Sequence, residues 1–157
     1  MSDNTLDIHS ALPYPSGTLS NFTNHPFDWQ GNRVESLEGF FQGLRFKEPE
    51  EQRRVWLMSG VEAKREGKRR KIINHTLYLY GKPFNRHSEF YQVLIRRVYF
   101  TMAANSTSFR RALLATGNKT LTHSIGKSDP NETMLTVNEF CGILTEIRNI
   151  ISEVKYD

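Results

Sequence analysis

The stretch VESLEGFFQGLRF, residues 34–46, predicts a helix around which the rest of the chain is organised. Ser36 suits the N-cap position, because its hydroxyl can accept a hydrogen bond from an unpaired amide of the first turn. The apolar residues that follow at helical spacing are Leu37, Phe40, Phe41 and Leu44. Residues with that spacing share one face of a helix, so we expect this face to be buried in the core.

The same helix carries a polar stripe beside its apolar face. Glu38, Gln42 and Arg45 stand at positions i, i+4 and i+7, which aligns a carboxylate, an amide and a guanidinium along one edge. Such a stripe can form the wall of a binding site. It is also the pattern of an ordinary solvated helix edge, which is the commoner case, and both interpretations stay open at this point.

Length and composition favour one globular domain. The chain has 157 residues, of which 38% are hydrophobic and 24% charged, so we expect a single domain over residues 1–157, with residues 1–10 as a flexible arm. No apolar run approaches the roughly 20 residues that a membrane span needs. The polar N-terminus lacks a signal pattern, and the one cysteine, Cys141, cannot form an internal disulfide. These features predict a cytoplasmic protein with no membrane partner.

Periodicity and capping residues predict an α+β fold that is mostly α, with a small β-hairpin or sheet packed among the helices. Further helices are expected over residues 49–58, 61–67, 88–104, 106–117 and 136–154. Thr136 and Glu139 form a capping box at the start of the last of these. Its apolar stripe predicts that this helix belongs to the core.

The remaining segments predict strands and loops. Residues 27–35, FDWQGNRVE, predict a hairpin that turns at Gly31-Asn32, because apolar and polar side chains alternate before the turn. Residues 72–86 fit a short strand or an aromatic-lined loop. Residues 117–135 form a long polar loop, and loops of that length in a compact domain are often functional.

Residues 64–71, KREGKRRK, contain six basic side chains in eight positions. Together with the net charge of +4 and the pI near 9.3, they favour an anionic partner. The segment can be a phosphate-binding patch, a solvated turn with surplus charge, or a nucleic-acid footprint. No zinc, RNA-recognition or helix-turn-helix signature accompanies it, which weakens the nucleic-acid interpretation.

The common catalytic motifs do not occur in the sequence: it has no Walker loop, GxGxxG, CxxC, HExxH or nucleophile elbow. The five histidines show no metal-ligand spacing. The polar groups that remain are the carboxylates Glu38, Asp129 and Glu132, the amides Asn21, Gln42 and Asn138, and basic residues. This set suits hydrolysis through an oxocarbenium-like transition state, in which a carboxylate activates water or stabilises positive charge.

Five segments follow one another in an informative order: LSNFTNHPF (19–27), VESLEGFFQGLRF (34–46), AKREGKRR (63–70), FRRALLATG (109–117) and NEFCGILTEIR (138–148). In this order they resemble the NADAR (NAD and ADP-ribose) superfamily, which includes the YbiA-like N-glycosidases of riboflavin-biosynthesis intermediates. The family carries an S-N-F segment, then P-S/T-x-E-H-x-F-Q-x-x-K-F, A-A-x-x-x-G-R, L-L-A-T-G and N-x-L-G-x-x-L-M-x-L-R. The resemblance covers about residues 12–151.

The resemblance implies a compact α+β domain with Glu38 as the catalytic carboxylate and Asp129 as an assisting one. The residues that it implies for substrate binding are Asn21, Phe22, Gln42, Arg45, Gly67, Lys68 and Asn138. It implies no metal and no cofactor. The sequence departs from the family pattern at Gly39, which stands in place of the family histidine, and at Arg45, which stands in place of the family lysine. The family's tryptophan-glycine-rich stretch before the last helix has no match in residues 126–137, and its tryptophan after the basic segment is also missing. An arginine keeps the charge but cannot act as an amine nucleophile, since its guanidinium stays protonated.

Three hypotheses about function follow. The first is an enzyme that hydrolyses an N-glycosidic bond of a ribose-phosphate or ADP-ribose-linked compound, an ADP-ribosylated nucleobase among them. The second, motivated by Gly39 and Arg45, is a protein that binds an ADP-ribose-like nucleotide without cleaving it. The third is a nucleic-acid-binding module, which depends on residues 64–71 alone. The expected partners are therefore a nucleotide or ADP-ribose-type ligand and, under the first and third hypotheses, modified nucleic acid.

Overall fold

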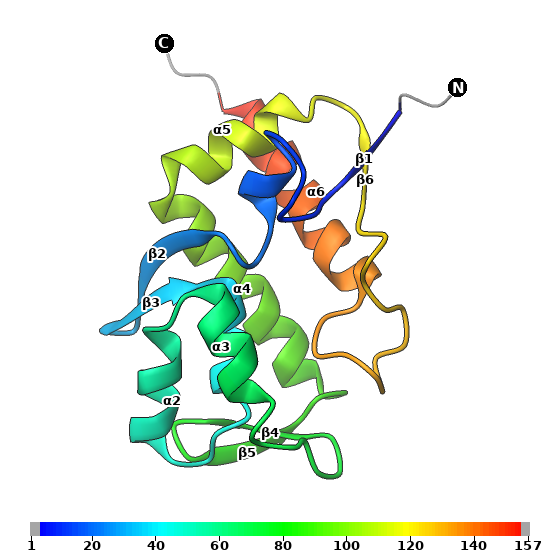
Figure 1. Ribbon diagram of the computed structural model, residues 1–157. Helices are drawn as coiled ribbons and strands as arrows, with labels where there is room; N and C mark the ends of the chain where they lie inside the picture. Colours follow the sequence, from blue (N-terminus) through cyan, green and yellow to red (C-terminus); the bar gives the residue numbers. More distant parts are fainter. Residues whose placement is uncertain (1–3, 155–157) are drawn as a thin grey trace. The chain divides into compact units, whose positions relative to one another are not determined.

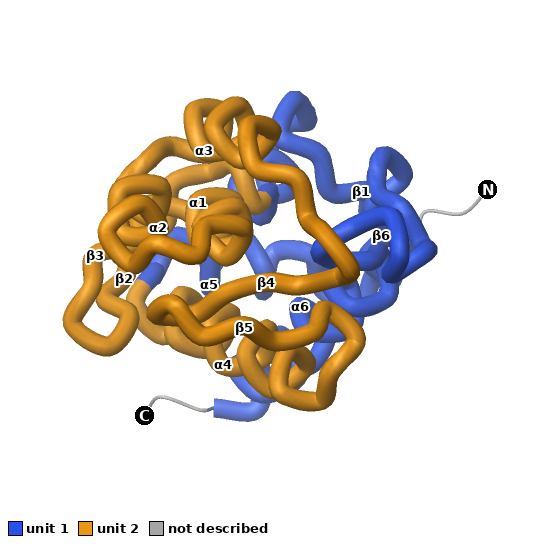
Figure 2. Tube along the Cα trace, turned by 90° about the horizontal axis from the view of Figure 1, so that it is seen from below, with its two compact units in different colours: residues 1–20, 106–157 blue, residues 21–105 orange. Residues whose placement is uncertain are grey.

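The computed structural model describes residues 4–154 of the chain (Figure 1). Its contacts divide into two compact units. Unit 1 consists of the described residues up to Ser20 and from Ser106 onward, and unit 2 consists of Asn21–Asn105 (Figure 2). The expectation of one domain over residues 1–157 stays a prediction.

Unit 2 begins with an antiparallel hairpin of β2 (Asn24–Trp29) and β3 (Asn32–Ser36). The sequence predicts the hairpin correctly, but its turn lies at Gln30-Gly31 and not at Gly31-Asn32, because Asn32 already pairs with Trp29. Both turn residues have positive φ, 51° and 88°, as a tight two-residue hairpin turn requires. Glycine at the second position adopts this conformation without steric cost.

Three short helices follow the hairpin: α1 (Leu37–Gly43), α2 (Pro49–Trp56) and α3 (Gly60–Gly67). They confirm the helices expected in this part of the chain, and α1 packs against both of the others. Ser36 caps α1 as predicted, since its hydroxyl accepts a 3.0 Å hydrogen bond from the amide of Gly39. The rings of Phe40 and Trp56 stack with 5.2 Å between their centroids, which fixes α1 on α2.

Residues 72–86, for which the sequence fits either a short strand or a loop, contain a second hairpin. It consists of β4 (Thr76–Leu79) and β5 (Lys82–Asn85). Gln52 of α2 anchors it, because its buried amide donates to the carbonyl of Tyr78 at 2.8 Å and accepts from the amide of Tyr80 at 3.1 Å. The long helix α4 (Glu89–Asn105) completes unit 2. In Figure 1 the hairpin crosses the lower end of this unit, below α2 and α3.

Unit 1 contains a parallel pair of short strands, β1 (Thr5–Asp7) and β6 (Thr120–Thr122). The flexible arm predicted for residues 1–10 is therefore wrong for its described part, and residues 1–3 lie outside the described residues. The loop predicted for residues 117–135 likewise contains a strand. The cause is tertiary: neither three-residue strand carries enough pattern to be recognised, and each is ordered by pairing with the other.

The remaining elements of unit 1 are the 3-10 turn η1 (Gly17–Leu19), α5 (Thr107–Ala115) and α6 (Val137–Glu153). The capping box of Thr136 and Glu139 is present as predicted. The buried side chain of Arg148 donates to the hydroxyl of Thr116 at 2.9 Å and to the carbonyl of Lys119 at 2.7 Å, which ties α6 to the turn after α5. Long helices with three short two-stranded sheets confirm the predicted α+β, mostly α class.

Candidate active site

The polar stripe of α1 faces other protein groups. The side-chain amide nitrogen of Gln42 donates a 2.8 Å hydrogen bond to the Glu38 carboxylate, which lies one turn earlier on the same helix. Glu38 is half-buried, and its backbone amide donates to the carbonyl of Asn21 at 3.1 Å. The S-N-F loop and the stripe are thus neighbours, and the stripe is not an ordinary solvated helix edge.

The surroundings of Glu38 alter its acidity. Burial raises the pKa of the Glu38 carboxyl above its ordinary value, while the bond from Gln42 and the charges of Lys64 and Arg45 act in the opposite direction. Burial dominates because removing a carboxylate from water penalises its charged form. A carboxyl with a raised pKa is a stronger proton acceptor once ionised, which suits a general base.

Arg45 lies just beyond the end of α1, where its guanidinium holds the chain that follows α3. Its Nη1 donates to the carbonyl of Gly67 at 3.3 Å and to the carbonyl of Arg70 at 3.1 Å. Burial lowers the pKa of Arg45, and the charge of Glu38 opposes that shift. The group therefore clamps backbone at the position where the family has its lysine.

The S-N-F loop is fixed from two sides. The side-chain oxygen of Asn21 accepts a 2.6 Å hydrogen bond from the hydroxyl of Tyr99 on α4. A Cβ on Gly60, the first residue of α3, would lie only 2.5 Å from the Cα of Phe22, so the loop rests directly on the helix backbone. Phe22 therefore lies beside the first turn of α3.

Lys64 belongs to the basic segment 64–71, and nothing in the sequence distinguishes it from the other basic residues there. Its Nζ lies 5.4 Å from the centre of the Phe22 ring, and its charge acts on the Glu38 carboxyl. Lys68, which was predicted instead, is exposed and one helical turn further along. The sequence shows that Lys64 follows Gly60 by four residues, but it does not show that Phe22 packs against Gly60. Without that contact, the spacing does not indicate that Lys64 lies beside Phe22.

Gly67 has a steric role that its motif does not reveal. A Cβ at this position would overlap the side-chain oxygen of Gln42. Gly67 therefore lets the Gln42 amide lie against α3 while its nitrogen reaches Glu38. Within the described part of the chain, the buried oxygen of Gln42 accepts no hydrogen bond, so this close packing alone fixes that end of the amide.

Two of the predicted site residues belong to unit 1, whereas the other seven belong to unit 2. Asp129 is exposed, and its carboxylate accepts a 2.9 Å hydrogen bond from the amide of Asn131, which forms a local turn. Asn138 is exposed on the first turn of α6. The structure thus brings together Asn21, Phe22, Glu38, Gln42, Arg45 and Gly67. The catalytic and binding roles of all nine predicted residues stay predictions.

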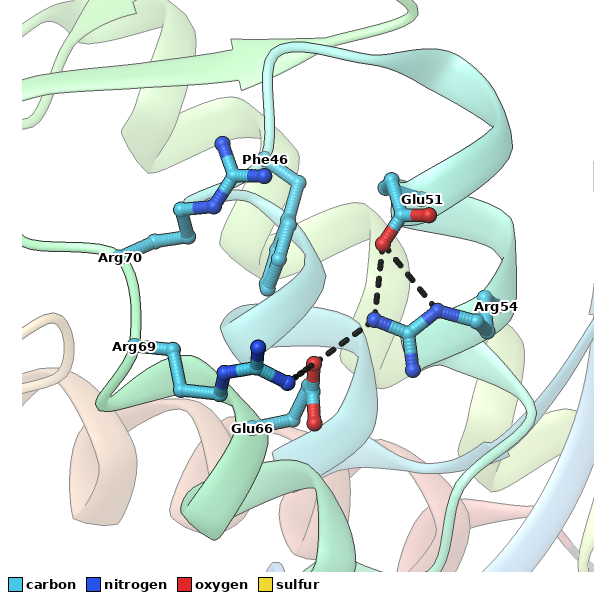
Figure 3. A pocket seen from close by; sticks show the side chains of 6 residues that line it. All are labelled: Phe46, Glu51, Arg54, Glu66, Arg69 and Arg70. Atoms are coloured by element: carbon cyan, nitrogen blue, oxygen red, sulfur yellow. Dashed lines mark hydrogen bonds and ion pairs between the residues drawn. The ribbon is translucent and has the colours of Figure 1, made fainter.

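A pocket of about 140 Å³ lies in unit 2, and none of the predicted site residues lines it (Figure 3). Its lining residues are Phe46, Glu51, Arg54, Glu66, Arg69 and Arg70. Arg54 bridges Glu51 at 2.8 Å and Glu66 at 2.7 Å, and Arg69 contacts Glu66 at 3.1 Å. The charges that line this pocket largely pair with one another, so they leave few unpaired charged groups for a ligand.

Residues 4–154 contain neither a cluster of metal-ligating side chains nor a helix that could span a membrane. In that range no group of three or more histidine, cysteine, aspartate or glutamate residues could hold a metal ion. Over the same residues no helix is both long and apolar enough to cross a membrane.

Comparison with known proteins extends the motif evidence. Residues 13–149 match the family described as "Bacteriophage protein GP30.3". The chain is 38% identical over 147 residues to the "Uncharacterized 17.1 kDa protein in Gp30-rIII intergenic region" of Enterobacteria phage T4, covering 92% of this chain and 97% of that protein.

A similar fold is found in the NMR structure of the E. coli protein YbiA, with a TM-score of 0.66 and 20% sequence identity. The match covers 99% of this chain and 92% of YbiA. At that identity the likeness concerns the fold alone, and it agrees with the order of motifs from the S-N-F loop to the last helix. The chain therefore belongs to the bacteriophage GP30.3 family and has a YbiA-like fold.

Proposed function

We propose that the chain is a hydrolase that cleaves an N-glycosidic bond of a ribose-phosphate or ADP-ribose-linked compound, with ADP-ribosylated nucleobases among the candidate substrates. The observation that carries the proposal is the half-buried Glu38 carboxyl, whose pKa is raised by burial and which Gln42 holds in place. Membership of a family with a YbiA-like fold suggests a glycosidase-type function and supports the same assignment.

The proposed reaction needs one ionised carboxylate. Glu38 accepts a proton from a water molecule as the water oxygen bonds to C1′ of the ribose. The electron pair of the C1′–N bond leaves with the base, whose nitrogen then takes up a proton. The negative charge of Glu38 also stabilises the positive charge that develops on the sugar in the transition state.

The neighbouring residues support this step. Gln42 orients the carboxylate through its 2.8 Å hydrogen bond, and Gly67 makes room for the Gln42 amide. Phe22 is only half-buried, so the exposed part of its ring can contact a ligand base or sugar beside Lys64. Asp129, Asn138 and Lys68 are retained in the proposal as assisting or binding residues.

The proposal is tested by incubating the protein with NAD, ADP-ribose, ADP-ribosylated guanine and a pyrimidine ribose phosphate, followed by mass spectrometry. We expect one substrate to release its base, and we expect Glu38→Gln to bind that substrate while losing turnover. Glu50→Gln, an exposed change on α2, is the matched control and should behave like the wild type. Undiminished turnover in Glu38→Gln would remove Glu38 from the chemistry.

A second candidate function is the capture of an ADP-ribose-like nucleotide without cleavage. Arg45 favours it, because its guanidinium is engaged with two backbone carbonyls and supplies no reactive amine at that position. Calorimetry that shows tight binding of ADP-ribose, combined with chromatography that recovers the ligand intact, would select this function. Recovery of a free base or of ribose phosphate would select the hydrolase.

A further inference from the structure

The basic residues around Glu38 make different contacts, and these contacts indicate different roles. This inference rests on the proposed function and names the group that binds the anionic part of its substrate. Arg45 Nη1 makes both of its hydrogen bonds to backbone carbonyls, those of Gly67 and Arg70. These bonds join the end of α1 to the turn after α3, which is a structural task. A substrate phosphate could engage this Nη1 only by breaking them.

Lys64 is placed differently. It is exposed on α3, and among residues 4–154 it forms no ion pair. Its Nζ is held 5.4 Å from the centre of the Phe22 ring, an arrangement that leaves the ammonium hydrogens on the side away from the ring free to bind an anion. Arg54, Arg69 and Arg70, in contrast, are already paired with Glu51, Glu66 and Glu48.

The position of Lys64 is set by the backbone. Phe22 lies directly on Gly60, the first residue of α3, and Lys64 follows Gly60 by one helical turn. The loop that approaches the catalytic carboxyl through Asn21 therefore also reaches the lysine through Phe22. Because the charge of Lys64 also acts on the Glu38 carboxyl, a phosphate attached to a sugar at Glu38 would lie within the influence of this ammonium.

We infer that Lys64, and not Arg45, is the cation that binds the phosphate of the substrate at this site, while Arg45 is a structural clamp. The ligand class is a sugar that carries a phosphate or pyrophosphate group. A lysine ammonium suits this task as a compact point charge on a flexible stem.

The experiment measures binding by calorimetry with two probes, ADP-ribose and adenosine, which lacks phosphate. We expect Lys64→Gln to weaken ADP-ribose binding by about tenfold or more, the effect of losing one charge-assisted hydrogen bond, and to leave adenosine binding unchanged. Lys64→Arg should restore most of the affinity. Lys47→Gln, an exposed lysine outside the site, is the matched control. Arg45→Gln should instead lower the melting temperature.

The outcomes separate this inference from the proposed function. Binding that depends on Lys64 in a protein without turnover supports the inference and counts against the hydrolase. Turnover and ADP-ribose affinity that are unchanged in Lys64→Gln support the hydrolase and overturn the inference. An equal loss of adenosine and ADP-ribose binding also overturns it, as does a wild-type protein that binds neither probe. The inference fails as well if Lys68→Gln alone reproduces the selective loss.

Discussion

Gln42 donates its side-chain amide to the carboxylate of Glu38 across one turn of α1, and it can do so only because residue 67 has no side chain. The relationship couples two helices, since Gln42 and Glu38 belong to α1 and Gly67 ends α3. A carboxylate that is held in this way keeps one orientation towards a substrate, which is a requirement for efficient catalysis.

Gly67→Ala should therefore damage the site more than the fold. The new Cβ would displace the Gln42 amide, which is the flexible end of a side chain and can move aside, while alanine is a better helix former than glycine. We expect catalytic turnover to fall by about tenfold, as for loss of an orienting hydrogen bond, with little change in melting temperature. NMR of the Gln42 side-chain amide reports its displacement directly.

The matched control is Gly142→Ala on α6, where a Cβ meets nothing within 4 Å. This change should stabilise the protein by about 0.5–1 kcal/mol through helix propensity and leave turnover unchanged. If Gly67→Ala and Gly142→Ala have the same turnover, the steric role assigned to Gly67 is wrong.

Glu38 should weaken the fold at neutral pH. Its pKa is raised by burial in the folded state, so the folded protein holds that proton more tightly than the unfolded chain does. The resulting stability is fully present below the unfolded pKa and is lost as pH rises through the folded pKa. Glu38→Gln, which stays neutral, should therefore melt higher than the wild type at pH 7, and this advantage should vanish in acid.

The measurement is thermal unfolding of the wild type and Glu38→Gln over the range from pH 3 to pH 8. Glu50→Gln is the control, since it makes the same chemical change at an exposed position on α2. A Glu38→Gln protein that is less stable than the wild type at pH 7 would show that the ionised carboxylate is well accommodated.

The helical part of the fold and the pairing of Glu38 with Gln42 could be predicted from local sequence. Side-chain caps mark the starts of two helices, Ser36 at α1 and Thr136 with Glu139 at α6. Such caps depend only on residues that are neighbours in the sequence. The stripe of Glu38 and Gln42 follows from helix periodicity in the same way. These features are set within one turn of chain, so their signals are complete in the sequence.

The features that could not be predicted depend on contacts between distant segments. The strands β1 and β6 pair Thr5 with Thr120, and neither has a pattern of its own. Lys64 gains its place from the contact of Phe22 with Gly60, 38 positions along the chain. The hairpin turn was misplaced by one residue because the bond from Gly31 to the Asp28 carboxylate, at 2.8 Å, favours the earlier pair.

The absence of a side chain at Gly39 is also explained by a contact with a distant segment. A Cβ there would lie 3.1 Å from the carbonyl oxygen of Val55 and 3.2 Å from that of Met58. The end of α2 therefore crowds the position at which the family has a histidine. We expect Gly39→His to destabilise the protein by about 1–3 kcal/mol through overpacking, measured by urea unfolding, with no gain in turnover. A stable Gly39→His variant would show that α2 can move away.

Gln52 is the polar residue whose loss should cost most stability. Its buried amide donates to the carbonyls of Gly43 and Tyr78 and accepts from the amide of Tyr80, so it joins α1, α2 and the β4–β5 hairpin. Gln52→Leu would leave these backbone groups without their partner. We expect a loss of about 2–4 kcal/mol, seen as a lower urea midpoint. Arg53→Leu, on the exposed side of α2, should change stability by only about 0.5 kcal/mol.

Cys141 should react slowly with thiol reagents despite being partly accessible. Burial, with a smaller contribution from the charge of Asp7, raises the pKa of its thiol from 9.0 to about 11. Because the thiolate is the nucleophile, a rise of two pKa units leaves about a hundredth of the ordinary thiolate population at pH 7.5. Alkylation by iodoacetamide, followed by mass spectrometry, should therefore be far slower in the native protein than in 8 M urea, where the burial is removed. The native rate should still climb with pH above 9, and equal native and unfolded rates at pH 7.5 would contradict the assigned environment of this thiol.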